Sequence, residues 1–146
     1  MLFSHDATMA GSDTGLYCFG AGASVVGYAG AKRAARLAAQ RDAFYQTTLR
    51  SYSEALRLGM TRKDVEAYLR GKSKPFQQMC CMERSAKNAY DDLTKIGEES
   101  HPWFCSAHNV YIGFEFVSAE SHRFPEAHES DTLTKVMVYH WLEGCL

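Results

Sequence analysis

The sequence has no excess of either charge. Its 146 residues include 16 Lys and Arg against 17 Asp and Glu, which gives a formal net charge of −1. Domains that bind nucleic acid usually gather basic residues on one face, so this balance argues against a nucleic-acid partner. The one basic cluster, "AKRAARLAAQR" at residues 31–41, is typical of the solvated face of a helix.

Charged residues are missing altogether from one stretch near the N-terminus. No Asp, Glu, Lys or Arg occurs between Thr14 and Ala31, a stretch that is rich in glycine and alanine. Its length and lack of charge suit a membrane anchor, whereas its glycines weaken helix formation and insertion. Residues 1–31 are therefore either a flexible Gly/Ala-rich leader or an anchor that contacts a membrane through residues 14–31. We expect the folded domain to span residues 32–146.

The next stretch, residues 32–58, has the hydrophobic period of one long helix. Four large apolar residues follow one another at spacings of four, three and four. These spacings place them on one helix face. They are Tyr45, Leu49, Tyr52 and Leu56. The stripe predicts a helix that packs this face on the core.

A second helix is expected from Arg62 to about Gly71. Thr61 precedes it as an N-cap, and Asp64, three positions later, completes an acidic variant of the capping box. Gly59 supplies the residue type that most often ends a helix in a left-handed conformation. The two helices are therefore predicted to meet at a tight corner.

The remaining sequence changes from a helical to a strand-like pattern. Residues 92–100, 109–119 and 133–141 predict three strands, whereas the segment that follows Pro75 is expected to be extended or irregular. In the middle strand, four apolar residues occupy every second position, so one face of this strand is predicted to face the core. These core residues are Val110, Ile112, Phe114 and Phe116. The predicted fold class is α+β, with two helices packed on a three-stranded antiparallel sheet.

The corner "LRLGMTRKDVEAYLRGK", residues 56–72, resembles the BamE/SmpA-like family, whose fold is shared with β-lactamase inhibitor proteins. The order of elements from about residue 51 to residue 141 also agrees. The matching residues are Gly59, Met60, Thr61, Val65 and Leu69. The long first helix and the cysteines depart from the typical small lipoprotein of this family. The resemblance implies a non-catalytic domain of the cell envelope that binds proteins through its sheet and loops.

Four cysteines lie between residue 80 and the C-terminus, and an even set favours two disulfides in an oxidising compartment. Adjacent cysteines do not bond easily to each other, so two connectivities remain. One joins Cys80 to Cys105 and Cys81 to Cys145, and the other exchanges the partners. Cys18 is then the odd cysteine.

Zinc binding is an alternative use of the same cysteines. Cys105 and His108 have the separation of two zinc ligands, and Cys81 with Cys145 would complete a tetrahedral site. The sequence lacks the second close-spaced pair that a zinc ribbon contains. Cys105 and His108 could also form a thiol nucleophile and its base, with a neighbouring glutamate orienting the imidazole. In either case the chain would be a cytoplasmic zinc-binding or redox-responsive module.

The last predicted strand has large side chains on both of its faces. If Val136 and Val138 face the helices, the larger residues between and after them form a patch that suits contact with another protein or a second copy. The candidate contact residues are Tyr111, Met137, Tyr139 and Trp141. A shift of one residue in register would instead bury these side chains in the core.

These observations favour a non-catalytic protein-interaction or envelope-assembly module that is stabilised by disulfides and needs no cofactor. The even cysteine set and the family resemblance favour the cell envelope or periplasm. Basic residues follow the apolar stretch but do not precede it, and this arrangement would keep an anchored domain in the cytoplasm. The alternative is therefore a cytoplasmic module that binds zinc or responds to redox state.

Overall fold

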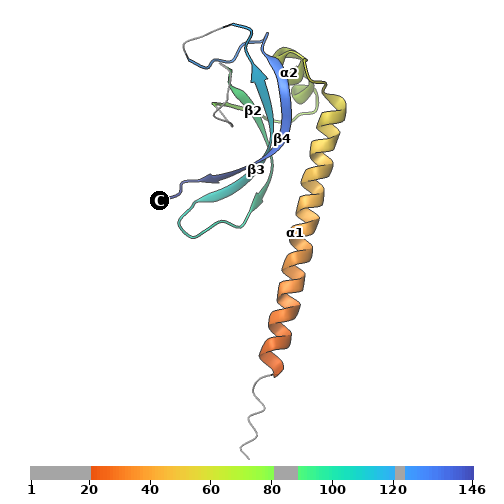
Figure 1. Ribbon diagram of the computed structural model, residues 1–146, viewed down its shortest axis with the longest axis vertical. Helices are drawn as coiled ribbons and strands as arrows, with labels where there is room; N and C mark the ends of the chain where they lie inside the picture. Colours follow the sequence, from red (N-terminus) through yellow and green to blue (C-terminus); the bar gives the residue numbers. More distant parts are fainter. Residues whose placement is uncertain (1–20, 81–88, 121–123) are drawn as a thin grey trace, which may run out of the picture. The chain divides into compact units, whose positions relative to one another are not determined.

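The structure is a computed structural model that describes residues 21–80, 89–120 and 124–146 (Figure 1). The chain divides into two compact units, Met1–Ala39 and Gln40–Leu146. Helix α1 (Ala21–Ala55) contributes residues to both units. Within the described residues, no helix combines the length and the hydropathy that a membrane span requires. Residues 14–20 of the expected leader or anchor lie outside the described part of the chain.

The part of α1 that belongs to the second unit packs on the core through the predicted stripe. Tyr45, Tyr52 and Leu56 are buried and Leu49 is half-buried, so the prediction of a core-facing stripe is confirmed. The helix starts earlier than expected, at Ala21, because its alanine-rich beginning carries little hydrophobic period.

The predicted corner between the helices is present in detail. Helix α2 (Arg62–Gly71) begins after Thr61, whose hydroxyl accepts a hydrogen bond from the Asp64 backbone N–H and donates one to the Asp64 carboxylate at 2.8 Å. Gly59 has a φ of +91°, a left-handed value that residues other than glycine rarely adopt. Local sequence therefore determines where α2 begins.

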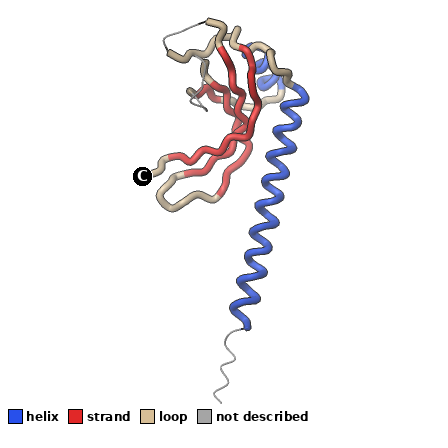
Figure 2. The backbone as a smooth tube through the Cα atoms, viewed as in Figure 1, coloured by secondary structure: helices blue, strands red, loops and turns tan. Residues whose placement is uncertain are grey.

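The sheet has four antiparallel strands in the order β1-β2-β3-β4 (Figure 2). They are β1 (Gln77–Met79), β2 (Asp91–Glu99), β3 (Ala107–Val117) and β4 (Thr132–Glu143). The sequence predicted the last three, and the expectation of a three-stranded sheet was wrong by one strand. β1 has only three residues, which is too short for a hydrophobic alternation, and it forms by pairing with the start of β2.

The core lies between the helices and one face of the sheet, which we call the helix face. The predicted core residues of β3 are at most 1% exposed, and Ile112, Phe114 and Phe116 belong to one core cluster with Tyr52, Leu56, Val65 and Leu69. The opposite face is called the open face. Figure 1 shows the strands curving away from the helices, so the sheet is concave on its open face. Two irregularities in strand register, in β2 and near the end of β3, accompany this curvature.

A buried ion-pair cluster fixes the start of α2 to the sheet. Arg62 is 2% exposed, and its guanidinium contacts Asp92 at 2.5 Å and Asp131 at 3.2 Å. It also donates to the Tyr90 carbonyl and lies 4.0 Å from the centroid of the Phe116 ring. Burial raises the pKa of Asp92 to about 7, while the charge of Arg62 acts to lower it. The cluster joins α2, β2 and the residue that precedes β4.

Candidate functional site

The structure places the four candidate contact residues on the open face of the sheet. In the β3–β4 ladder, Tyr111 lies opposite Tyr139, and Trp141 lies opposite Asn109. Val136 and Val138 pack against the core on the helix face. The register that would bury the β4 aromatics is therefore not the one observed. The Tyr139 and Trp141 rings pack edge to face with centroids 5.7 Å apart.

Tyr111 differs from the other three because it is buried, with 6% of its surface exposed. Its hydroxyl donates to the Glu143 carboxylate at 3.1 Å, and the Asn109 side-chain amide donates to the same oxygen at 2.7 Å. Burial, followed by this hydrogen bond, raises the pKa of Tyr111. Tyr111 is therefore covered although it lies on the open face, and the accessible residues are Met137, Tyr139 and Trp141.

Strand β4 is at the edge of the sheet. Its first residues are covered by the helix corner, because the Leu133 backbone exchanges hydrogen bonds with Gly59 and Met60 at 2.8 and 2.9 Å. From residue 134 to residue 143, β3 is the only strand that pairs with β4 within the described residues. Every second residue of this ten-residue stretch thus points its backbone N–H and C=O groups to the side away from β3.

A groove of about 510 Å³ lies beside the same edge. The end of α1 and the turn after it form one wall, and β4 forms the other. Lining residues include Leu56, Arg57, Leu58, Thr134, Lys135 and Val136. Leu58 is 66% exposed. The groove therefore combines an apolar floor with two basic side chains.

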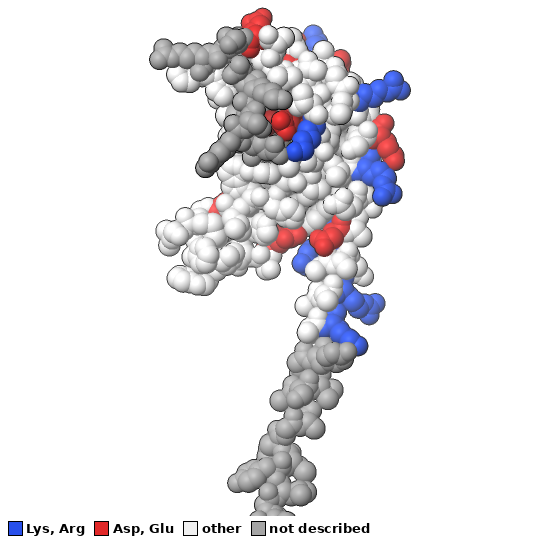
Figure 3. Space-filling view, viewed as in Figure 1, with Lys and Arg blue, Asp and Glu red and all other residues white. Residues whose placement is uncertain are grey.

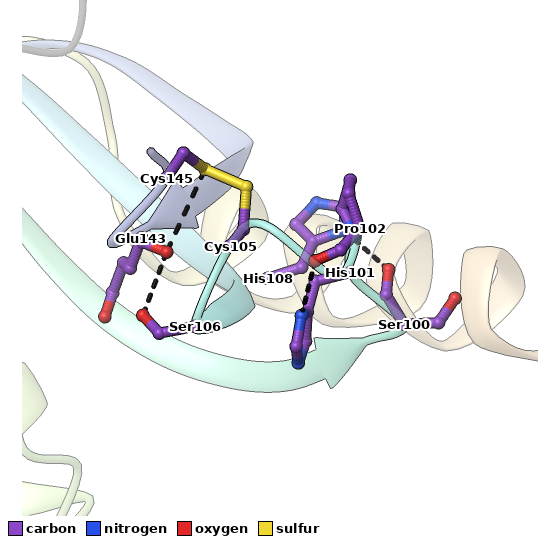
Figure 4. Close-up of a disulfide and its surroundings, with 8 residues drawn as sticks. All are labelled: Ser100, His101, Pro102, Cys105, Ser106, His108, Glu143 and Cys145. Carbon is purple, nitrogen blue, oxygen red and sulfur yellow. Dashed lines mark hydrogen bonds between the residues drawn. A yellow bond between two sulfur atoms is a disulfide. The ribbon is translucent and has the colours of Figure 1, made fainter.

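The far ends of β3 and β4 are joined by a disulfide between Cys105 and Cys145 (Figure 4). This pairing differs from both expected connectivities. The ladder continues past Ala107 and Glu143, which brings the two cysteines opposite each other. Cys80 follows β1 at the other edge of the sheet, and it is also disulfide-bonded.

Cys81 and Cys18 lie outside the described residues. The expected zinc site is not assembled, because Cys105 and Cys145 are bonded to each other and supply no thiolate. The same bond removes Cys105 as a nucleophile. His108 instead lies 3.7 Å from the Glu99 carboxylate, on the helix face.

Charged side chains do not gather into a single patch on the face of the second unit that Figure 3 shows. Lys and Arg are interspersed with Asp and Glu, and most of the visible surface is uncharged. This distribution agrees with the balanced composition.

No protein-family model, curated protein or solved structure matches the chain. The resemblance to the BamE/SmpA-like family therefore rests on the corner residues and on the order of the elements.

Sequence reasoning missed two features of the surface. The groove is made by Leu58 and Lys135, which lie on segments far apart in the chain, and no local pattern links them. Trp103, in the loop between β2 and β3, is 91% exposed although tryptophan is usually well covered. Exposure of this kind depends on the path of the loop, which its sequence does not specify.

Proposed function

We propose that the second unit is a protein-interaction module that binds an extended segment of a partner protein along β4. The observation that carries this proposal is the ten-residue stretch of β4 edge that, among the described residues, pairs on one side only. Unpaired N–H and C=O groups on such an edge can bond to an added strand, which is a common mode of peptide recognition.

Side chains on both sides of this edge suit an added strand. Alternate residues of an extended peptide would point toward the open face and toward the groove. On the open face they would meet Met137, Tyr139 and Trp141. Aromatic residues contribute a large share of the binding energy in many interfaces. Arg57 and Lys135 beside the groove favour a partner segment that carries acidic residues.

The disulfide supports a location in an oxidising compartment, where such bonds persist. The resemblance to an envelope family points the same way. A non-catalytic role in the cell envelope is therefore part of the proposal, with the partner recognised mainly through its backbone and two or three anchoring side chains.

A peptide-display selection on the purified, oxidised chain tests the proposal. Selected peptides should protect backbone amides between residues 134 and 143 from hydrogen exchange. Trp141→Ser should weaken their binding at least tenfold. Trp103→Ser, the same chemical change at the other tryptophan, should leave binding within twofold.

Two results would contradict this function. One is protection confined to another part of the chain, and the other is equal binding by both tryptophan variants. Sedimentation analysis tests whether a second copy of the chain occupies the same edge instead. If the chain forms dimers that Trp141→Ser dissociates, the edge binds a second copy of the chain and not a segment of a partner protein.

A further inference from the structure

Three adjacent strands each place one potential metal ligand at the same point of the helix face. Glu99 ends β2 and pairs directly with His108 of β3, while His140 of β4 lies diagonally across from His108. Their ligand atoms all lie within 4.8 Å of one another. The Glu99 carboxylate is 3.7 Å from His108 and 3.8 Å from His140.

The surroundings of this cluster hold the carboxylate in place. Tyr45 of α1 is 4% exposed, and its hydroxyl hydrogen-bonds to Glu99. The Tyr45 ring also contacts the His140 ring, with centroids 6.1 Å apart. Gly97 leaves room for this arrangement, because a Cβ there would lie 2.9 Å from the Tyr45 hydroxyl oxygen. A carboxylate oriented by a buried tyrosine is typical of the outer shell around a metal ligand.

The cluster is also accessible from solvent. The side chains of Glu99 and His108 are 18% and 19% exposed, and that of His140 is 45% exposed. An ion could therefore reach the three ligands and keep a further position for water or another ligand. Protein zinc sites with an open position use three protein ligands in this way.

We propose that Glu99, His108 and His140 bind a divalent transition-metal ion of the zinc class. Two imidazoles and one carboxylate are ligands that this class accepts, whereas Mg²⁺ and Ca²⁺ prefer oxygen ligands alone. Ligand atoms around tetrahedral zinc are about 3.3 Å apart, given bonds of about 2.0 to 2.1 Å. The observed carboxylate–imidazole separations of 3.7 and 3.8 Å need to close by about half an ångström, and the remaining separation, which is within 4.8 Å, by up to about 1.5 Å.

This site shares strand β4 with the proposed contact but not its aromatic residues. It uses the helix face of the sheet, whereas Met137, Tyr139 and Trp141 lie on the open face. The metal would tie the ends of three strands together close to the disulfide.

The test is zinc titration by calorimetry of the full oxidised chain, prepared without a polyhistidine tag and freed of metal with a chelator. We expect one ion per chain. His140→Ala and Glu99→Gln should each lower the affinity at least tenfold. His101→Ala removes an exposed histidine of the β2–β3 loop and should change the affinity less than twofold. Tyr45→Phe should lower it about tenfold without abolishing binding.

Circular dichroism establishes that each variant is folded, and Co²⁺ absorption provides a second readout that does not depend on heat. A cobalt spectrum typical of mixed nitrogen and oxygen ligands, lost in His140→Ala, supports the site. The proposal is overturned if the wild-type chain shows no saturable zinc binding, or if His140→Ala binds zinc as the wild type does.

Discussion

Replacing Arg62 with methionine should be among the most destabilising single changes in this chain. The guanidinium is 2% exposed and lies between the carboxylates of Asp92 and Asp131, both of which have no exposed surface. Methionine fills much of the same volume but leaves both buried carboxylates without their cation. Removing one partner of a buried ion pair costs about 3 to 5 kcal/mol, a large share of the 5 to 15 kcal/mol typical of a domain.

The cost should grow with pH. Burial raises the pKa of Asp92 to about 7, well above its value of 3.8 in the unfolded chain, so this group stabilises the folded state most at low pH. That contribution is lost as the pH rises toward 7, where the folded wild type releases the proton. Arg62 lowers this pKa, so the variant should hold the proton to a higher pH. Its deficit should then increase by about 1.4 kcal/mol for each pH unit above 7.

Urea unfolding followed by circular dichroism at pH 6 and pH 8 measures both effects. Adding Asp92→Asn to the Arg62 variant should remove the pH-dependent part, because the buried group no longer ionises. Arg70→Met, on the exposed side of α2, removes a pair with Glu66 that solvent screens, and it should cost less than about 0.5 kcal/mol. Equal stability of the Arg62 and Arg70 variants at both pH values would refute the reasoning.

Three further changes test the corner, the disulfide and the packing of α1 on the sheet. Thr61→Ala should lower the free energy of unfolding by about 1 kcal/mol through loss of the N-cap. Gly59→Val should lower it more, because the φ of Gly59 is +91°. Urea titrations of these variants that match the wild type would contradict the assignment of the corner. Cys145→Ala opens a 40-residue disulfide loop and should cost about 2 to 4 kcal/mol, and reductant should destabilise the wild type at least as much because Cys80 is also disulfide-bonded. Gly97→Ala places a methyl group against the Tyr45 hydroxyl and should cost about 1 to 3 kcal/mol, so an unchanged melting temperature would show that α1 adjusts freely.

Much of the secondary structure could be predicted from the sequence, because the signals involved act between near neighbours. The stripe from Tyr45 to Leu56 depends on spacings of three and four residues, and the N-cap depends on the three positions from Thr61 to Asp64. Strand alternation in β3 likewise depends on every second residue. Each of these predictions agrees with the structure.

Some predictions failed because they concern pairs of residues that are distant in the chain. We excluded a bond between Cys80 and Cys81 because the two cysteines are adjacent, and this also excluded the bond between Cys105 and Cys145. The strand register nevertheless brings Cys105 opposite Cys145, and these two are bonded. β1 was missed because a three-residue strand exists only through its pairing with β2.

The sequence by itself determined the helix corner, the three longer strands and the grouping of Met137, Tyr139 and Trp141 on one face of β4, since each follows from local periodicity. The strand register of the tertiary structure decided that this face points away from the helices. Only the tertiary structure decided that Arg62, a basic residue in the first turn of a helix, is buried, and that Glu99, His108 and His140 meet. The physical reason is that strand pairing brings together residues 9 and 32 positions apart in the chain. No local pattern encodes which side chains will share one point of a curved sheet.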